Sequence, residues 1–368
     1  MNTIGRYLRV SVVGGSHASH VGCIVDGIPP GIKIQYEEIE RLILLRKPVA
    51  GLGTSRVEED RPEIISGVKD GYTDGTPITI LIRNSDIDSR PYIRLKDTPR
   101  PGHADYTAYL KYGERRDFRG GGIFSGRMTA PIVVAGGIAE GVLHLRGIRV
   151  VAHASCIGGV HAPEIRYEKL NSEDLKKLKD RIAGSRVRCH DRRASELMEK
   201  VILQVKKGKD SIGGTVSCAI IGVPGGIGDP FFDTIEGEIS KWMFSIPGIK
   251  SVAFGSGSEC PAMRGSEFND PFEVKNGRII TSTNHSGGVL GGITTGMPIV
   301  FHVNVRPTSS IGIPQKSVNL KTQSPAIIRI TGRHDPCIVP RAVPVVEACA
   351  SLCILDTLLS AGYKFTGE

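Results

Sequence analysis

The segment TGRHDPCIVPRAVP, residues 331 to 344, places an arginine, an imidazole and a carboxylate side by side. One glycine and three prolines restrict the backbone around these groups. The segment is therefore too polar for a core and too stiff for a linker. A cation, a titratable ring and a carboxylate are the groups that bind an anion and move a proton. We take Asp335 as the first candidate for catalysis.

Other polar clusters lie in connections that are rich in glycine or proline. They are GGSHASH (14–20), RKPVAGLGTSR (46–56), PRPGHADYT (99–107), RGGGIFSGRM (119–128) and RPTSS (306–310). Loops held by a rigid scaffold are the usual place for ligand chemistry. The glycine-rich cluster has the composition of a phosphate cradle, although its spacing matches no standard phosphate motif. His17 and His20 have no third metal ligand nearby, so we predict no metal site.

The charge favours a small anionic ligand. The chain has 368 residues, a net charge of +9, 40% hydrophobic and 23% charged residues, which is typical of a folded protein. Aromatic residues make up only 5%, and the arginines stand singly among glycines. Nucleic-acid binders usually interleave basic and aromatic residues. We therefore expect a small phosphorylated acid as the ligand and no nucleic acid.

The cysteines and the apolar segments indicate a cytoplasmic location. The eight cysteines are scattered and form no C-x-x-C pair, which favours reduced and mostly buried thiols. No run of about 18 uncharged apolar residues predicts a membrane span. The first residues, MNTIGRYLRVSVVGG, lack the length and cleavage site of a signal peptide.

Two parts of the chain resemble each other. CIVDGIPPGI (23–32) is similar to CAIIGVPGGI (218–227), and DGTPITILI (74–82) is similar to TGMPIVFHV (295–303). The two spacings differ, which excludes an exact tandem repeat. We predict a single domain over residues 1–368. Its pseudo-repeated halves cover about 1–150 and 210–365, and a helical, charged connection covers about 161–210.

Two long segments, APIVVAGGIAEGVLHL and VVEACASLCILDTLLSAG, are apolar on nearly every side of a helix. Such helices must be covered on both sides. Segments such as TPITILI show the alternating pattern of side chains that is typical of β-strands. The predicted fold class is therefore α+β: a β-α-β sandwich in which long helices pack between antiparallel sheets from the two halves.

Taken together and in order, the motifs resemble those of the chorismate synthase family. They are GGSH, RPGHADYT, RGGG, NHSGGVLGGITTGMPI, RPTSS and GRHDPC, and the similarity runs from the first residues to about residue 360. The resemblance implies a phosphate lyase. Its reaction is the anti 1,4-elimination of phosphate from 5-enolpyruvylshikimate 3-phosphate, the last common step of the shikimate pathway. It also implies a need for reduced FMN without net redox change, and a cytoplasmic homotetramer.

Matching motif by motif implies roles for individual residues. His17 and His103 correspond to the family's catalytic histidines, and Asp335 to the residue that acts with the flavin when the substrate's C6 proton is removed. The implied substrate-binding residues are Arg46, Arg56, Arg100, Arg127 and Arg333. Arginine's bidentate fork suits phosphate and carboxylate groups. The implied FMN-binding residues are Ser125, Gly291, Arg306, Pro307, Thr308, Ser309, Ser310 and Arg333. His334 is interpreted as a structural neighbour.

Several positions depart from the family pattern. Gly15 and Ala18 replace a glutamate and a glycine, and Arg306 replaces a lysine. Ile123 and Phe124 replace an arginine and a serine, and the pair Pro247–Gly248 replaces Asn-Ala. The changes cluster around the flavin, so they predict an altered FMN affinity, with Phe124 packing on the ring. The long insertions of relatives that reduce their own flavin with NADPH are absent, so we expect an external flavin reductase.

Two alternatives stay open at this point. A non-catalytic paralogue could keep the fold and bind an anion or flavin, but all three catalytic candidates and five arginines are retained. A basic nucleic-acid-binding protein is the second alternative, and a steep salt dependence of DNA or RNA binding would favour it.

Overall fold

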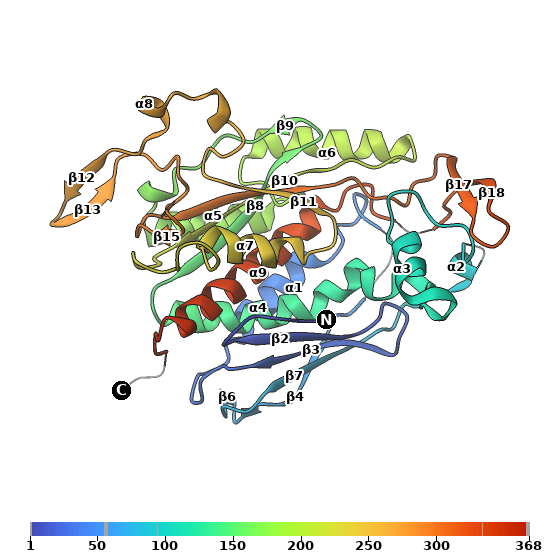
Figure 1. Cartoon of the computed structure of the whole chain (residues 1–368), viewed down its shortest axis with the longest axis horizontal. Coiled ribbons are helices and arrows are strands. Elements are labelled where there is room, and N and C mark those ends of the chain that lie inside the picture. Colours follow the sequence, from blue (N-terminus) through green and yellow to red (C-terminus); the bar gives the residue numbers. More distant parts are fainter. Residues whose placement is uncertain (1, 55–57, 94, 333, 366–368) are drawn as a thin grey trace.

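Two five-stranded antiparallel sheets enclose a layer of long helices (Figure 1). The structure is a computed structural model and describes residues 2–54, 58–93, 95–332 and 334–365. The first sheet has the order β1 (Thr3–Ile4), β2 (Arg9–Gly14), β3 (His20–Asp26), β7 (Ile78–Arg83), β4 (Pro62–Ser66). The second has the order β11 (Ile249–Phe254), β16 (Ile299–Val305), β10 (Gly214–Ile221), β8 (Arg149–Ile157), β9 (Val160–His161).

The middle layer consists of α1 (Tyr36–Arg46), α4 (Thr129–His144), α7 (Ile235–Phe244) and α9 (Val339–Ser360). Both α4 and α9 are buried on nearly every side, as their apolar sequences predict. In the described part of the chain, α9 alone is long and apolar enough to cross a membrane, but 94% of its apolar window is buried inside the protein. The apolar composition of α9 is therefore explained by its burial between the two sheets.

Two features of the sequence explain how these layers pack: apolar residues that alternate along the strands, and small residues where helices cross. In β7, Ile78, Ile80 and Ile82 all point into the core and are at most 1% exposed. Where α4 crosses α9, a side chain on Gly136 would place its Cβ 2.2 Å from the Cβ of Ala348. Glycine is thus required for the two helices to lie so close.

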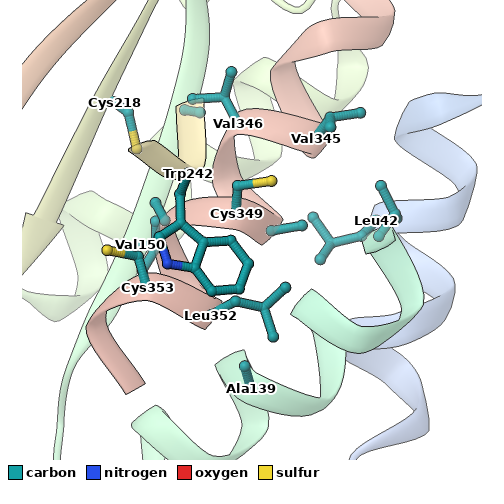
Figure 2. Close-up of a cluster of buried hydrophobic side chains, with 14 of the residues drawn as sticks. Leu42, Ala139, Val150, Cys218, Trp242, Val345, Val346, Cys349, Leu352 and Cys353 are labelled. Carbon is teal, nitrogen blue, oxygen red and sulfur yellow. The ribbon is translucent and has the colours of Figure 1, made fainter. Parts of the chain in front are cut away.

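The core between the helices and the second sheet is apolar and contains several thiols. Figure 2 shows the ring of Trp242, from α7, beside Cys349, Leu352 and Cys353 of α9. All eight cysteines are free, and all except Cys260 are buried. The predicted burial of most thiols is confirmed. Burial raises the pKa of the Cys349 thiol to about 12, so this thiol stays protonated at neutral pH.

Two amphipathic helices, α5 (Ser172–Gly184) and α6 (Arg192–Lys207), lie against the outer face of the second sheet. Asn171 caps α5 with a capping box, and Asp191 caps α6. Smaller elements extend from the layers: β5 (Val68–Lys69), β6 (Tyr72–Thr73), α2 (Arg90–Ile93), α3 (Asp105–Tyr112), α8 (Gly265–Phe268), β12 (Phe272–Lys275), β13 (Arg278–Thr281), β14 (Val289–Leu290), β15 (Ile293–Thr294), β17 (Gln315–Asn319) and β18 (Ser324–Ile328).

The two layers of sheet have the same plan. The order β2, β3, α1, β4, β7, α4 in the first half corresponds to β8, β10, α7, β11, β16, α9 in the second. The strands of each set are neighbours in the same sequence within their sheet, and α5 and α6 are inserted between β8 and β10. The predicted fold class is confirmed. The exact boundaries of the two halves stay a prediction, and β8, which begins at Arg149, belongs to the second sheet.

Candidate active site

A cavity of about 280 Å³ lies where the C-terminal end of α1 meets the N-terminal ends of α4 and α9. Loops from both halves of the chain complete its wall, including the segments after β16 and before α3. Most of the polar clusters singled out in the sequence meet here. The residues predicted to bind ligands or act in catalysis that line the cavity are Arg46, Arg100, His103, Ser125, Arg127, Arg306, Thr308, Ser309, Ser310 and Asp335.

The cavity is positively charged. Its described lining residues include five arginines, Arg46, Arg100, Arg127, Arg306 and Arg341, against the three carboxylates Glu58, Asp60 and Asp335. The N-terminal ends of α4 and α9 also reach the cavity, so the positive end of each helix dipole lies beside it. Such a site favours an anion with several charged groups.

Arg46 and Arg127 share one buried carboxylate. Nη1 of Arg46 lies 2.9 Å from Oδ2 of Asp60, and Arg127 binds the other oxygen. Arg46 also donates to Thr129 Oγ1 over 3.0 Å, while Arg127 Nε donates to Asn84 Oδ1 over 2.7 Å. These contacts fix two guanidinium groups side by side at the start of α4.

Arg100, which also lines the cavity, is held in a second ion pair. Its Nε donates over 2.7 Å to Oδ2 of Asp105 and its Nη2 over 2.8 Å to Oδ1. Its Nη1 reaches Ser310 Oγ at 3.2 Å, and the guanidinium lies over the ring of Tyr92. Burial raises the pKa of the Asp105 carboxyl, but hydrogen bonds from Arg100 and His103 outweigh burial and hold this pKa well below its usual range.

Asp335 is clamped between two segments. Its Oδ1 accepts from the backbone N–H of Thr54 over 2.7 Å, and its Oδ2 accepts from Arg341 Nη1 over 2.7 Å. Arg341, in the first turn of α9, also donates to the backbone oxygen of Arg46. Thr308 Oγ1 donates to the backbone oxygen of Asp335 over 2.8 Å. The carboxylate of Asp335 therefore joins the segment after α1 to α9, and its backbone oxygen holds the RPTSS loop.

His334 lines the same cavity. Burial and the positive charge of Arg100 together lower the pKa of its imidazole to about 4, although Asp335 opposes this shift. The ring is therefore neutral near pH 7, beside a cation and a carboxylate. The resemblance left this residue without a role, yet the structure places it in the wall.

The glycine-rich loop forms part of the wall without side chains. Gly120 and Gly121 have φ of 59° and 86°, the left-handed region that glycine adopts most readily. A Cβ on Gly120 would lie 2.5 Å from His17 Nε2, and one on Gly121 would lie 3.3 Å from His103 Nε2. The backbone therefore comes close to both rings, and only glycine allows this approach.

Three predicted residues do not line the cavity. His17 lies behind Gly120, with its Nδ1 2.9 Å from Ser89 Oγ and its ring edge-on to Tyr92. Gly291 lies in the β14–β15 turn next to the N-terminal end of α7, whereas the cavity is reached by residues after the C-terminal end of that helix. Ten helical residues span about 15 Å, so Gly291 is remote. Pro307 stands between two lining residues.

Arg56 and Arg333 lie outside the described residues. Of the positions that depart from the family pattern, Phe124, Pro247, Gly248 and Arg306 line the cavity, while their nearness to a flavin stays a prediction. Sequence reasoning missed Thr54, Asp60, Tyr92 and Arg341, which also line it. Arg341 follows Asp335 by six residues in one quoted segment, and that proximity was a usable signal; Asp60 had none.

Buried arginines at the ends of helices, beside a carboxylate and the neutral imidazole of His334, are typical of an enzyme that binds a phosphorylated acid and transfers protons. The comparisons with known proteins give the family. Residues 8–359 match the profile of the chorismate synthase family, and the chain belongs to this family.

Relatives from distant organisms match almost end to end. The chorismate synthase of Thermococcus gammatolerans is 44% identical over 355 residues, covering 96% of this chain and 97% of the relative. That of Dehalococcoides mccartyi strain 195 is 44% identical over 362 residues, covering 98% and 97%. A crystal structure of chorismate synthase aligns with a TM-score of 0.76 and 28% identity, covering 97% of this chain and 93% of that one. The predicted activity, a carbon–oxygen lyase of the chorismate synthase type, is confirmed.

Proposed function

We propose that this cavity is where 5-enolpyruvylshikimate 3-phosphate loses phosphate to form chorismate, with reduced FMN bound beside it. The observation that carries the proposal is the convergence of Arg46, Arg100 and Arg127 with Asp335 and His103 on one cavity. In the net reaction a C–H bond and a C–O bond of the substrate break, a double bond forms, and a proton and phosphate leave. The site needs anion-binding groups at one end and a proton acceptor at the other.

The substrate's phosphate and two carboxylates are assigned to the arginines. Arg46 and Arg127 present two guanidinium groups at the start of α4, where the helix dipole also favours an anion. Arg100 lines the same cavity. Because Asp60 and Asp105 already hold these arginines, little side-chain entropy is lost on binding. Arg56 and Arg333 stay in the proposed set through the family resemblance.

The residues around the cavity fit a flavin. Gly120 and Gly126 line the cavity without side chains, and Phe124 offers an aromatic face. Arg306 and the hydroxyls of Thr308, Ser309 and Ser310 are suited to a phosphate. These residues, with Ser125, would hold FMN. When bound in its reduced form, FMN supplies the transient electron that this elimination requires without net redox change.

Proton transfer is assigned to the chain's own titratable groups. Asp335 accepts the proton that leaves the reaction centre, and Thr54 and Arg341 keep its carboxylate in place for this step. His103 faces the glycine loop, where its ring can accept and return a proton. His17 lies behind the same loop, with Gly120 between its ring and the cavity. The proton transfer that we propose for His17 is therefore indirect.

We further propose a cytoplasmic homotetramer that receives reduced flavin from an external reductase and binds neither nucleic acid nor membrane. The support is the set of free thiols, the sparse aromatic content and the absence of the long insertions of relatives that use NADPH. Purified protein given oxidised FMN and NADPH in air should then form no product. Turnover under those conditions would contradict the reductase proposal.

Asp335→Asn tests the assignment of the site. The amide keeps the size of the side chain but cannot accept a proton, so kcat should fall at least about 100-fold while KM changes by less than about threefold. Asp70→Asn is a control, because Asp70 is exposed in the β5–β6 turn and asparagine tolerates its positive φ. Steady-state kinetics with reduced FMN measure both variants. A proportional loss in kcat and in substrate affinity would count against the role of Asp335.

A further inference from the structure

Asp105, the first residue of α3, turns its carboxylate back toward the segment that precedes the helix. Its Oδ2 accepts from the backbone N–H and from Nε of Arg100, over 3.0 and 2.7 Å. Its Oδ1 accepts from Arg100 Nη2 over 2.8 Å and lies 2.7 Å from Nδ1 of His103. Both oxygens are thus engaged, and the side chain is only 15% exposed.

The distances decide which ring nitrogen of His103 carries the proton. Nδ1 lies 2.7 Å from a carboxylate oxygen and 3.2 Å from Arg100 Nη2. A bare Nδ1 would direct its lone pair at that carboxylate, which is repulsive, whereas an Nδ1–H donates a short charge-assisted hydrogen bond. Arg100 Nη2 already donates to Asp105 Oδ1. The proton therefore belongs on Nδ1.

The other nitrogen, Nε2, faces the glycine-rich loop. It lies 3.3 Å from the position that a Cβ on Gly121 would take, next to Gly120, which lines the cavity. With Nδ1 occupied, Nε2 is the nitrogen that can accept or return a proton there. The titratable and charged groups that face this ring are Asp105, Arg100 and His334.

We infer that Asp105 is a positioning residue that holds His103 as the Nδ1–H tautomer and presents Nε2 to the glycine-rich loop. Carboxylate–imidazole pairs of this kind orient the working histidine in other enzymes. Asp105 also neutralises Arg100, whose positive charge would otherwise repel a protonated His103. The H-x-D spacing of RPGHADYT places the carboxylate at the start of α3, where the helix dipole favours it.

The test reads the tautomer of His103 directly, by long-range ¹H–¹⁵N correlation of the imidazole nitrogens in full-length labelled protein at neutral pH without substrate or flavin. His103→Gln identifies the signals. We expect a protonated Nδ1 and a bare Nε2 in the wild type. In Asp105→Asn the amide NH₂ can donate to Nδ1, so the proton should move to Nε2. Asp88→Asn is the control, because Asp88 pairs with Arg90 through the same two nitrogens without touching His103.

The kinetic readout rests on the proposed function. Asp105→Asn should lower kcat about 100-fold or more, and Asp105→Glu, which keeps the carboxylate, should restore part of the rate. A wild-type His103 protonated at Nε2, or an unchanged tautomer in folded Asp105→Asn, would overturn the inference. If Asp105→Asn does not fold, the wild-type tautomer alone decides. A wild type without turnover would refute the proposed function and leave the tautomer result intact.

Discussion

Asp335 shows how a single carboxylate becomes fixed in a loop. Its two oxygens accept from Thr54 and Arg341, which lie in the segment after α1 and in the first turn of α9. The side chain is 9% exposed, so each donor replaces water that burial has removed. Its position is thus set by two elements that are far apart in the chain.

Arg341→Ala should loosen this arrangement. Asp335 would lose the donor to Oδ2, and we expect kcat to fall about 10- to 100-fold, with a loss of about 1 to 3 kcal/mol in the free energy of unfolding. Arg341→Lys keeps a charge but lacks the fork that also reaches Arg46, so it should restore only part of the rate. Kinetics and denaturant unfolding measure both effects.

Arg192→Ala is the matched control. Its guanidinium is 95% exposed and pairs with Glu196 one helical turn away, so the variant should behave like the wild type. If Arg341→Ala retained full kcat, the clamp on Asp335 would have no part in catalysis.

The residue scale also separates what the sequence could predict from what it could not. Arg46, Arg100 and Arg127 are found in glycine- or proline-rich motifs, and all three line the cavity. His17 does not line the cavity, because Gly120 stands between its ring and the cavity. Only the fold reveals this arrangement. Motif matching assigns roles to residues. Which side chains face the cavity depends on how the loops pack in the folded chain, and motifs do not record this.

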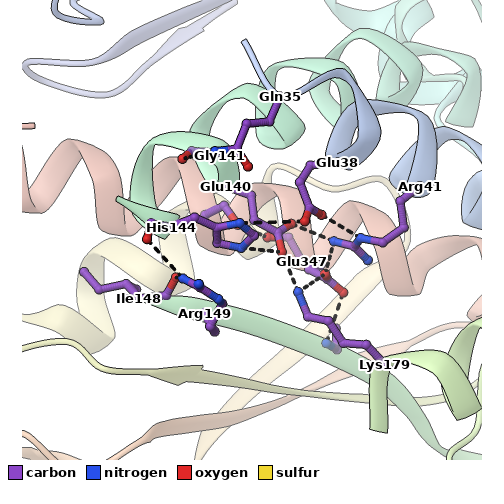
Figure 3. A network of polar contacts seen from close by, with 12 residues as sticks. Gln35, Glu38, Arg41, Glu140, Gly141, His144, Ile148, Arg149, Lys179 and Glu347 are labelled. Atoms are coloured by element: carbon purple, nitrogen blue, oxygen red, sulfur yellow. Dashed lines mark hydrogen bonds and ion pairs between the residues drawn. The ribbon is translucent and has the colours of Figure 1, made fainter. Parts of the chain in front are cut away.

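At the scale of elements, a buried network of charges joins the helices of the middle layer to α5 (Figure 3). Glu140 of α4 is fully buried and accepts from Lys179 of α5 over 2.5 Å and from Arg41 of α1 over 2.7 Å. Arg41 also binds Glu347 of α9. Burial raises the pKa of the Glu140 carboxyl, but the charges of Lys179 and Arg41 outweigh burial and keep this pKa below its usual range.

Lys179→Met should leave Glu140 with one charged partner fewer in a site without water. We expect a loss of about 2 to 4 kcal/mol in the free energy of unfolding, since removing one member of a buried pair strands the other. Urea unfolding at fixed protein concentration is the measurement. In the control Lys177→Met, an exposed pair with Glu173 is removed, and the cost should stay below about 1 kcal/mol. Equal losses in the two variants would contradict a structural role for the network.

The sequence predicts the position of some helices in the fold, but not the contacts between them. The all-round apolar segments correctly predicted that α4 and α9 lie between two sheets, because such helices have no face for water. Nothing in the sequence predicted that Glu140, in the middle of one of those segments, is neutralised by Lys179 from the predicted connection. Pairing between distant elements depends on packing, which local patterns do not record.

At the scale of the whole molecule, three histidines lie under the outer layer of helices. His153, His190 and His302 are brought together around the second sheet, where Ser217 is paired in register with both His153 and His302. His153 Nε2 lies 3.0 Å from Tyr167 Oη. Burial lowers the pKa of His153 to about 3, and burial also lowers the pKa of His190 and of His302.

These shifts predict a loss of stability in acid. A histidine has an ordinary pKa near 6.5, so between about pH 6.5 and pH 3 the unfolded chain binds a proton that folded His153 refuses. The free energy of unfolding should fall as the pH falls through this window, by about 2 kcal/mol at pH 5 from His153 alone.

The variant His153→Gln isolates this contribution. Urea unfolding at pH 7.5 and pH 5.0 should show a difference about 2 kcal/mol smaller in the variant than in the wild type, even though the variant is less stable at pH 7.5. The same pH dependence in both proteins would contradict the assignment to His153.

The central claim is that the cavity at the ends of α1, α4 and α9 performs the chorismate synthase reaction with reduced FMN. The most direct measurement mixes the purified wild type with 5-enolpyruvylshikimate 3-phosphate and chemically reduced FMN without oxygen, and follows phosphate and chorismate together. We predict their release in equal amounts, with turnover lost when FMN is kept oxidised. Folded protein that binds reduced FMN and substrate but releases no phosphate would contradict the account.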